Sequence, residues 1–287
     1  MENIKVSYLD EEITEAKEQG FLDYRTSELP TWCPGCGYFG ITHAIGQTCH
    51  DLGLKNEDIC AVSGIGCAGR FPYFMDSYGF HTLHGRAVPI ASGVKLANDK
   101  LTVFAVGGDG DMFGIGGGHL PHIARKNIDI TLFVFDNSIY GLTKGQSSAT
   151  TPMGQSTNSH PYGNPDTPLR PVTMALAYGS SFVARCYAGD MDGMRDVFKK
   201  AITHKGFSFI HILSPCVTFD KVNITWENMK NKFANIHSSH NASEYEAAIR
   251  LAEDPRLHLG VFYRDKNRLS YQEHLSKLHT PDKTDKG

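Results

Sequence analysis

The 287-residue sequence lacks the features that direct a chain to a membrane, to export or to nucleic acid. No apolar run approaches the roughly 18 residues that a membrane span needs. The first residues, Met1 to Gly20, are heavily charged and hold no apolar core or small-residue cleavage site of a secretory signal. The 28 Lys and Arg nearly balance the 31 Asp and Glu, so bulk charge does not attract the chain to nucleic acid or an anionic bilayer. We therefore expect a soluble, cytoplasmic protein.

A disulfide framework is also not expected, because the seven cysteines are an odd number in a chain without an export signal. Cys49, Cys60 and Cys186 stand in apolar or ordinary surroundings, and we interpret them as small core residues. The other four cysteines need a different explanation, which depends on the fold around them.

The length allows one large domain or two ordinary ones. Short apolar runs alternate with helix-like segments in the middle of the chain, and the runs mostly lack polar alternation, as strands covered on both faces do. The expected strands are Ile59–Val62, Leu101–Val106, Ile128–Phe135, Phe207–Leu213 and a weaker Ser181–Arg185. The expected helices are Phe39–Asp51, Val88–Asn98, His119–Lys126, Val172–Gly179 and Met191–His204. This alternation predicts an α/β fold with a doubly wound, mostly parallel sheet.

Two regions depart from this pattern. Gly141–Pro171 is rich in Ser, Thr, Gly, Asn and Pro, and a loop of that length in a compact domain is usually functional or disordered. The chain turns polar after Asp220 and ends in a Lys/Asp-rich tail from Pro281 that we expect to be mobile, although Leu257–Tyr263 is apolar enough to dock. We expect a cofactor domain over residues 1–220 and an extension over 221–287 that packs on the domain or on a partner.

A glycine-rich loop with an acidic residue follows the strand Leu101–Val106. Its sequence, Gly107-Gly108-Asp109-Gly110-Asp111, lies between a strand and a helix, where backbone N–H groups can bind phosphate. Asp109 would repel a bare phosphate, so the loop makes sense with a cation between them, most naturally Mg²⁺. A second ligand is expected from Asp136-Asn137 after the next strand, since both loops open at the carboxyl edge of a parallel sheet.

Gly108-Asp109-Gly110 followed by Asn137 resembles the thiamine-diphosphate motif. The resemblance implies a thiamine-diphosphate-binding fold with Mg²⁺ on Asp109, Asn137 and the backbone carbonyl of Ile139. The cofactor pocket that it implies comprises Gly66, Cys67, His84, Gly108, Asp109, Gly110, Asp111, Asn137, Ile139, Gly141 and Leu142.

Cys33 and Cys36 form a C-x-x-C, for which three interpretations compete. A dithiol redox pair would need a preceding strand, which is not predicted here. A zinc knuckle would need a second C-x-x-C or a His pair, and neither exists. An iron–sulfur cluster accepts dispersed thiolates, and Cys67 and Cys216 each follow a predicted strand at the edge that carries the Gly-Asp-Gly loop.

Five motifs occur in the order found in the β subunit of 2-oxoacid:ferredoxin oxidoreductases, and the resemblance spans Trp32 to Cys216. They are Cys33-Pro34-Gly35-Cys36-Gly37, Gly64-Ile65-Gly66-Cys67, His84-Gly85-Arg86, Gly108-Asp109-Gly110 and Gly145-Gln146-Ser147-Ser148. The resemblance implies one [4Fe–4S] cluster on Cys33, Cys36, Cys67 and Cys216. It also implies oxidative decarboxylation of a 2-oxoacid to acyl-CoA and CO₂, with electrons passing through the cluster to ferredoxin.

The sequence shows no glutamate for the aminopyrimidine ring of the cofactor, so the resemblance implies an α subunit that supplies it in an α₂β₂ assembly. The resemblance also implies that Arg70 faces the active site, where its guanidinium could bind the distal carboxylate of 2-oxoglutarate. His84, Leu142 and Lys144 are expected near substrate or cofactor. We expect 2-oxoglutarate as substrate, with pyruvate second, and coenzyme A as co-substrate.

Other functions remain open from the sequence. A non-redox thiamine-dependent decarboxylase or lyase would have structural cysteines around zinc. A dithiol oxidoreductase would leave the Gly-Asp-Gly loop unexplained, and a non-catalytic module would not be expected to retain Asp109, Asn137 and all four cysteines.

Overall fold

The computed structural model describes residues 24–220, 225–230 and 232–279. An eight-stranded sheet runs through them in the order β2-β1-β3-β4-β8-β7-β10-β9, and every neighbouring pair is parallel except β7 and β10. Its strands are β1 (Ile59–Ser63), β2 (Tyr78–His81), β3 (Thr102–Gly108), β4 (Thr131–Asp136), β7 (Phe182–Tyr187), β8 (Ser208–Leu213), β9 (Phe233–Asn235) and β10 (Leu257–Arg264). The predicted α/β fold with a mostly parallel sheet is confirmed.

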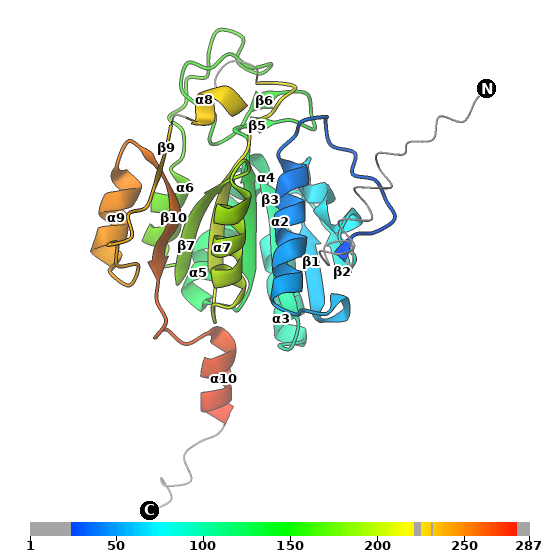
Figure 1. Ribbon diagram of the computed structural model, residues 1–287, viewed down its shortest axis with the longest axis vertical. Helices are drawn as coiled ribbons and strands as arrows, with labels where there is room; N and C mark the ends of the chain where they lie inside the picture. The colour runs from blue at the N-terminus through cyan, green and yellow to red at the C-terminus, as the bar shows by residue number, and fades with distance from the viewer. Residues whose placement is uncertain (1–23, 221–224, 231, 280–287) are drawn as a thin grey trace, which may run out of the picture.

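Helices cover both faces of the sheet (Figure 1). One face is covered by α2 (Tyr38–Asp51) and α7 (Met191–Ile202), and the other by α3 (Ala87–Ala97), α5 (Leu120–Lys126), α6 (Pro171–Ala177) and α9 (Tyr245–Glu253). Short elements complete the described chain: α4 (Asp109–Phe113), α8 (Trp226–Lys230), α10 (Tyr271–His279), the two-residue strands β5 (Ile139–Tyr140) and β6 (Gln146–Ser147), and the 3-10 turns η2 (Asn56–Asp58), η3 (Ala68–Tyr73) and η4 (Ile115–His119).

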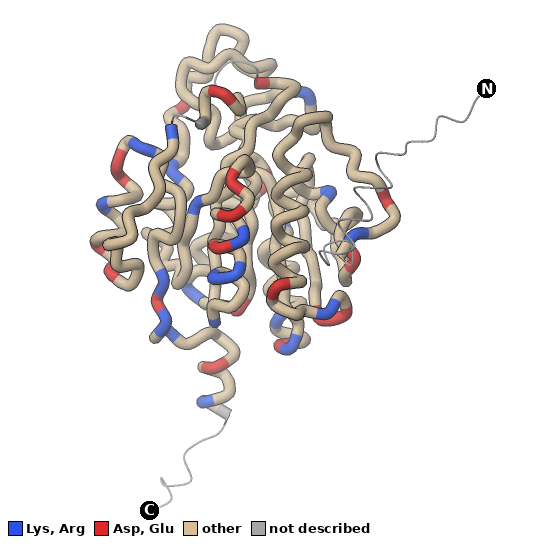
Figure 2. Tube along the Cα trace, in the orientation of Figure 1, with Lys and Arg blue, Asp and Glu red and all other residues tan. Residues whose placement is uncertain are grey.

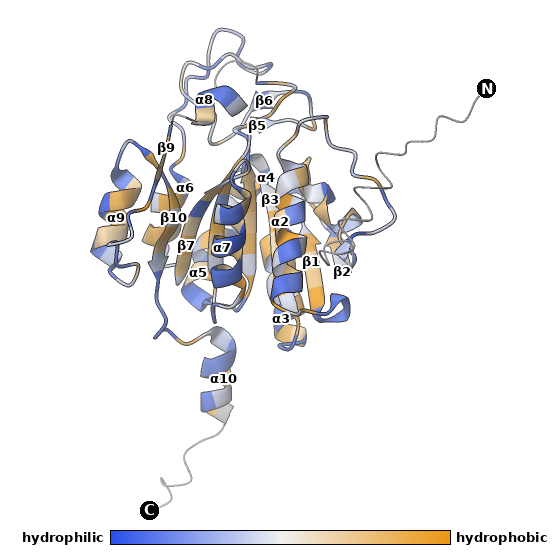
Figure 3. Cartoon of the chain, viewed as in Figure 1, coloured by the Kyte–Doolittle hydropathy of each residue, from blue (hydrophilic) through white to orange (hydrophobic). Residues whose placement is uncertain are grey.

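Strand alternation divides the core between the two faces. Phe133 and Phe135 of β4 pack under α2 and α7, whereas Leu132 and Val134 pack against the opposite helices. Because both of its faces are buried, β4 is almost wholly apolar, whereas the outward faces of α2 and α7 are hydrophilic (Figure 3). Acidic and basic residues are interspersed along α7 (Figure 2).

All five predicted strands and all five predicted helices are present with small shifts at their ends. The segment Leu257–Tyr263 does dock, but as strand β10, which pairs antiparallel with β7 and parallel with β9. Strands β2, β9 and β10 and helices α9 and α10 were not predicted. The charged residues Met1–Gly20 and the tail from Pro281 lie outside the described residues. In the part of the chain that is described, no helix is long and apolar enough to cross a membrane.

The parallel arrangement brings the ends of β1, β3, β4 and β8 to one edge of the sheet. The loops that follow them, with β5 and β6, form the upper end of the molecule in Figure 1, and few charged residues lie there (Figure 2). Cys67, Asp109, Asn137 and Cys216 lie in or next to these loops, whereas the Cys33–Gly37 motif precedes α2 and the His84–Arg86 motif lies between β2 and α3.

Candidate active site

Asp109 stands where strand β3 gives way to α4 and is 1% exposed. The backbone N–H of Asn137, in the loop after β4, donates to its Oδ1 at 3.3 Å. A turn then brings Ile139 to the same place, since the Ile139 N–H donates to Oδ1 of Asn137 at 3.2 Å. The Gly-Asp-Gly loop and the Asp136-Asn137 loop therefore meet, as the sequence predicted.

The carboxylate of Asp109 is in an unfavourable electrostatic environment. Burial, and after it the charge of Asp136, raises the pKa of Asp109 well above its ordinary value. A cation bound at Asp109 would oppose both effects and favour the ionised carboxylate.

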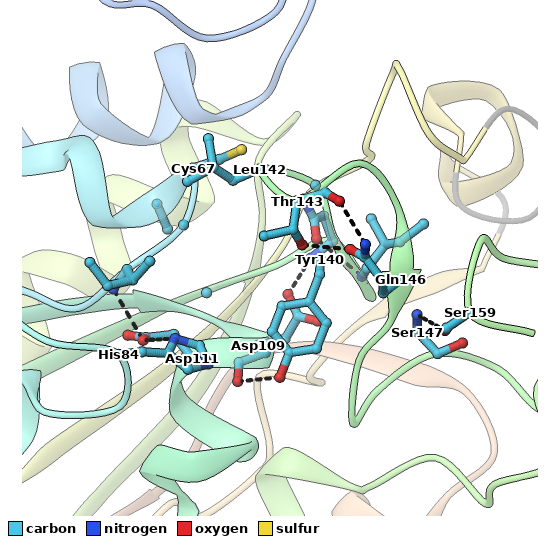
Figure 4. A pocket seen from close by; sticks show the side chains of 18 of the residues that line it. Cys67, His84, Asp109, Asp111, Tyr140, Leu142, Thr143, Gln146, Ser147 and Ser159 are labelled. Carbon is cyan, nitrogen blue, oxygen red and sulfur yellow. Dashed lines mark hydrogen bonds and ion pairs between the residues drawn. The ribbon is translucent and has the colours of Figure 1, made fainter.

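Asp111 joins two neighbouring loops. Its Oδ1 accepts the N–H of Gly85 at 2.7 Å and that of Ile65 at 3.1 Å, and lies 2.7 Å from Nδ1 of His84. A Cβ at Gly64 would lie 1.8 Å from Oδ2 of Asp111, so this position requires glycine. Asp111 thus fixes the loop after β1 and the approach to α3, and Figure 4 shows it with His84 at one end of the pocket.

Gly110 is required by close packing rather than by an unusual backbone angle. A Cβ there would meet Cε1 of Tyr140 at 2.3 Å, and the Tyr140 hydroxyl donates to the Gly110 carbonyl at 2.9 Å. The Tyr140 ring therefore holds the Gly-Asp-Gly loop against β5.

A cavity of about 570 Å³ opens among these loops (Figure 4). All residues of the predicted cofactor pocket line it: Gly66, Cys67, His84, Gly108, Asp109, Gly110, Asp111, Asn137, Ile139, Gly141 and Leu142. We call this space the larger cavity. Its position at the carboxyl edge of the parallel strands is where doubly wound folds bind ligands.

The four cysteines left unexplained by the core surround a second, adjoining cavity of about 240 Å³. Cys33, Cys36, Cys67 and Cys216 all line it, and we call it the cysteine cavity. Its wall toward the larger cavity is shared: Tyr38, Cys67, Asn137, Gly141 and Leu142 line both spaces. By contrast Cys49, Cys60 and Cys186 are buried in the core, as predicted.

The thiols converge without closing around a single ion. A Cβ at Gly141 would lie 3.5 Å from Sγ of Cys67 and 3.9 Å from Sγ of Cys216, so both sulfurs flank this glycine. Burial, supplemented by the neighbouring Cys67 and Cys216, raises the pKa of Cys36 to about 12. No set of three or more His, Cys, Asp or Glu within the described ranges could hold one metal ion. Thiols spread around a cavity suit a cluster, which is wider than one ion.

Two residues predicted to act on substrate lie on the cysteine cavity and not on the larger one. Arg70 donates to Oγ1 of Thr31 at 2.6 Å, and its charge opposes the effect of burial, which raises the pKa of Cys67. Lys144 is exposed and has a φ of 86°, in the left-handed region that non-glycine residues rarely adopt. His84 lines the larger cavity and Leu142 lines both cavities, and their contact with substrate or cofactor stays a prediction.

Sequence reasoning missed part of the lining of the larger cavity. The missed residues are Tyr38, Ile65, Ala68, Tyr140, Thr143, Gln146, Ser147, Ser159 and His160. Five of them come from the long loop 141–171, whose length had marked it as functional: Thr143, Gln146, Ser147, Ser159 and His160. Ser147 and His160 are in contact there, with Oγ 2.9 Å from Nδ1.

Two family models match the chain. The model of the C-terminal TPP-binding domain of thiamine pyrophosphate enzymes matches residues 64–212. The model of the C-terminal part of the pyruvate ferredoxin oxidoreductase β subunit matches residues 216–280.

The similar proteins are named as 2-oxoacid or 2-oxoglutarate oxidoreductases or their subunits. The chain is 38% identical over 278 residues to 2-oxoacid:ferredoxin oxidoreductase 2, subunit beta, of Aeropyrum pernix, covering 91% of this chain and 88% of that protein. It is 45% identical over 198 residues to the 2-oxoglutarate oxidoreductase subunit KorB of Mycobacterium tuberculosis, covering 69% of this chain and 53% of that protein. Among solved structures, a 2-oxoglutarate:ferredoxin oxidoreductase from Magnetococcus marinus with 2-oxoglutarate, coenzyme A and succinyl-CoA bound superposes with a TM-score of 0.88 at 40% identity, over 90% of this chain and 89% of that one.

Proposed function

The chain belongs to the β-subunit family of the 2-oxoacid:ferredoxin oxidoreductases, and from this premise we propose that it binds the cofactor of a 2-oxoglutarate-oxidising enzyme. The observation that carries the proposal is the wall shared by the larger cavity and the cysteine cavity. A carbon centre that loses electrons in one space would lie next to an electron acceptor in the other.

Thiamine diphosphate would occupy the larger cavity, where it would supply an electron sink for decarboxylation of a 2-oxoacid. The residues fit such a ligand, since the Gly108–Asp111 loop brings backbone N–H groups and a buried carboxylate to the cavity. Tyr140 holds this loop in place, and Asp111 holds His84 at the rim.

Mg²⁺ would be held by the Asp109 carboxylate, the Asn137 side-chain oxygen and the Ile139 carbonyl, with diphosphate oxygens completing its shell. The fit rests on the donor set, which is oxygen only, and on the buried Asp109 carboxylate, which forms no ion pair with a basic side chain among the residues that the structure describes. Both features favour a hard divalent cation.

Cys33, Cys36, Cys67 and Cys216 would hold one [4Fe–4S] cluster in the cysteine cavity. The charge of Arg70 lies close enough to Cys67 to affect its thiol. That position favours a role for Arg70 and Lys144 beside the cluster, and their contact with substrate stays a prediction. Ferredoxin would accept electrons at this side of the molecule.

An α subunit would complete the site. No glutamate of the described part of the chain lines the larger cavity, and the proposal assigns the group that faces the aminopyrimidine ring to the α subunit. Large apolar side chains beside the cavity are exposed, among them Leu83 at 75%, Ile115 at 64% and Leu142 at 40%, as expected of a surface that a partner covers. We propose an α₂β₂ assembly in the cytoplasm, where free thiols persist. Within this chain, residues 1–220 would form the cofactor domain and residues 221–287 an extension.

Anaerobic co-purification with the α subunit tests this function. The assembly should be brown, contain about four iron atoms per β chain, and reduce a viologen dye with 2-oxoglutarate and coenzyme A faster than with pyruvate. A colourless, zinc-containing assembly that decarboxylates without reducing the dye would instead support the non-redox thiamine enzyme.

A further inference from the structure

A chain of buried polar side chains lies behind Asp109, and of its members only Asp136 belongs to a motif discussed above. It consists of Arg185 on β7, His211 on β8, Asp136 at the end of β4 and Thr150 in the long loop, and each is at most 8% exposed. Strand register brings them together. Arg185 pairs with His211 across β7 and β8, and Val134, two residues before Asp136 on the same face, pairs with His211 across β4 and β8.

The hydrogen bonds fix the protonation of His211. Arg185 Nε can only donate, so Nδ1 of His211 must accept this bond of 3.2 Å. The imidazole proton is then on Nε2, which lies 2.7 Å from Oδ2 of Asp136 and donates to it. His211 is therefore neutral and passes the orientation set by Arg185 on to Asp136.

Asp136 is surrounded by donors, so it is held as a carboxylate in one orientation. Its Oδ1 accepts the backbone N–H of Ser138 at 2.8 Å and the Thr150 hydroxyl at 2.8 Å. The same hydroxyl lies 3.2 Å from Oδ2 of Asp109. Because a threonine has only one hydroxyl proton, Thr150 can screen one carboxylate at a time, and both compete for it.

The four residues are not packed in a solid core but line a further cavity, which lies behind the Asp136–Ile139 turn. Asn137 and Ile139 line the larger cavity, whereas Asp136, Ser138, Thr150, Arg185 and His211 line a separate cavity of about 370 Å³. Buried ion pairs are often no more stabilising than apolar side chains of the same volume. Stability alone therefore does not explain this network.

We propose that the Asp136–His211–Arg185 chain orients the Thr150 hydroxyl and that Thr150 in turn positions the Asp109 carboxylate, and that this chain thereby sets the affinity of the site for a divalent cation. The inference rests on the proposed magnesium site. When a cation occupies Asp109, the Thr150 proton is free to turn to Asp136, so the two carboxylates no longer compete for it. Groups that orient metal ligands in this way typically change metal affinity about 10- to 100-fold when removed.

The test is the variant Thr150→Val, which removes the hydroxyl and keeps the shape of the side chain. Mn²⁺ binding to the intact assembly with the α subunit, at saturating thiamine diphosphate, is followed by the EPR signal of the free ion. We expect the dissociation constant to rise about 10-fold or more, and Thr150→Ser, which restores a hydroxyl, to recover most of the wild-type affinity.

Thr48→Val is the matched control, because Thr48 is also buried but donates to the Ala44 carbonyl of its own helix. It should bind Mn²⁺ as the wild type does. Iron content and thermal unfolding show that each variant is folded. If Thr150→Val binds Mn²⁺ with wild-type affinity, this inference is wrong. The proposed function is unaffected by that result, because cation binding is measured without turnover. A wild-type assembly that binds no divalent cation overturns the proposed magnesium site and this inference together.

Discussion

At the scale of single residues, the site depends on side chains that hold loops as much as on those expected to touch a cofactor. Tyr140 packs on Gly110, and Asp111 binds the N–H groups of Ile65 and Gly85. A larger residue at position 110 would break the first contact, and an uncharged residue at position 111 would weaken the second. The glycines of the motif are therefore required by protein packing as well as by room for a phosphate.

The variant Gly110→Ala tests this interpretation. Its Cβ would overlap Tyr140, so the ring or the loop must move, and we expect thiamine diphosphate affinity to fall about 10-fold or more, since misplacement of about 1 Å is costly in such sites. The measurement is isothermal titration calorimetry of the apo-assembly with Mg²⁺ present.

Gly118→Ala is the matched control in the same glycine-rich stretch. Nothing lies within 4 Å of a Cβ at Gly118, so this variant should bind the cofactor normally. Equal affinity of the two variants would show that the Tyr140 contact does not constrain the loop.

At the scale of secondary structure, the end of α7 is tied to the start of β7 through a histidine. Nε2 of His204 lies 2.8 Å from Oγ of Ser181, and this hydroxyl lies within hydrogen-bonding distance of Oδ1 of Asn127 at 2.6 Å. Burial, and secondarily the charge of Arg264, lowers the pKa of His204 from 6.5 to about 4. The folded protein thus holds this histidine neutral.

A pH dependence of stability follows. Because the pKa is lower in the folded state, the contribution is fully present above the unfolded pKa of 6.5 and is lost as the pH falls toward about 4. The free energy of unfolding should fall over this window by up to about 3 kcal/mol, and His204→Gln should remove that component. Urea unfolding at several pH values measures it, with His50→Gln, at the exposed end of α2, as the control. A slope unchanged by His204→Gln would contradict the assignment.

The elements that sequence could predict are those buried on both faces. Apolar runs in the sequence correspond to strands β1, β3, β4, β7 and β8, and the turns after β3 and β4 carry Asp109 and Asn137. The sequence therefore predicted both the central sheet and the residues at its carboxyl edge. The side chains of β2 are all exposed, which removes the apolar signal. Strand β10 runs antiparallel at the far side of the sheet and breaks the strand–helix alternation on which the prediction relied.

Contacts across strands were beyond sequence reasoning for a different reason. Asp136 and His211 are 75 positions apart, and their contact depends on the register of β4 against β8. Tyr38 lines both cavities only because α2 crosses the sheet near the end of β4, where its hydroxyl donates to the Phe135 carbonyl. The positions of Arg70 and Lys144 on the cysteine cavity depend on loop conformation, which a single sequence does not determine.

At the scale of the whole molecule, the proposed active site extends beyond this chain. The two cavities share a wall, and the large apolar side chains of Leu83, Ile115 and Leu142 beside the larger cavity are exposed in the isolated chain. Burial of such a surface by the α subunit would exclude water from the reacting carbon and strengthen the electrostatic interactions around it. We therefore expect the isolated β chain to be inactive with 2-oxoglutarate.

The central claim is that substrate oxidation in the larger cavity passes electrons to iron in the cysteine cavity. EPR spectroscopy of the anaerobic assembly, mixed with 2-oxoglutarate and coenzyme A, tests it most directly. We predict a reduced-cluster signal that requires thiamine diphosphate, is absent in Cys67→Ala and is retained in Cys49→Ala, where a core cysteine is replaced. An assembly that turns over 2-oxoglutarate with no iron signal, or with the signal intact in Cys67→Ala, would contradict the account.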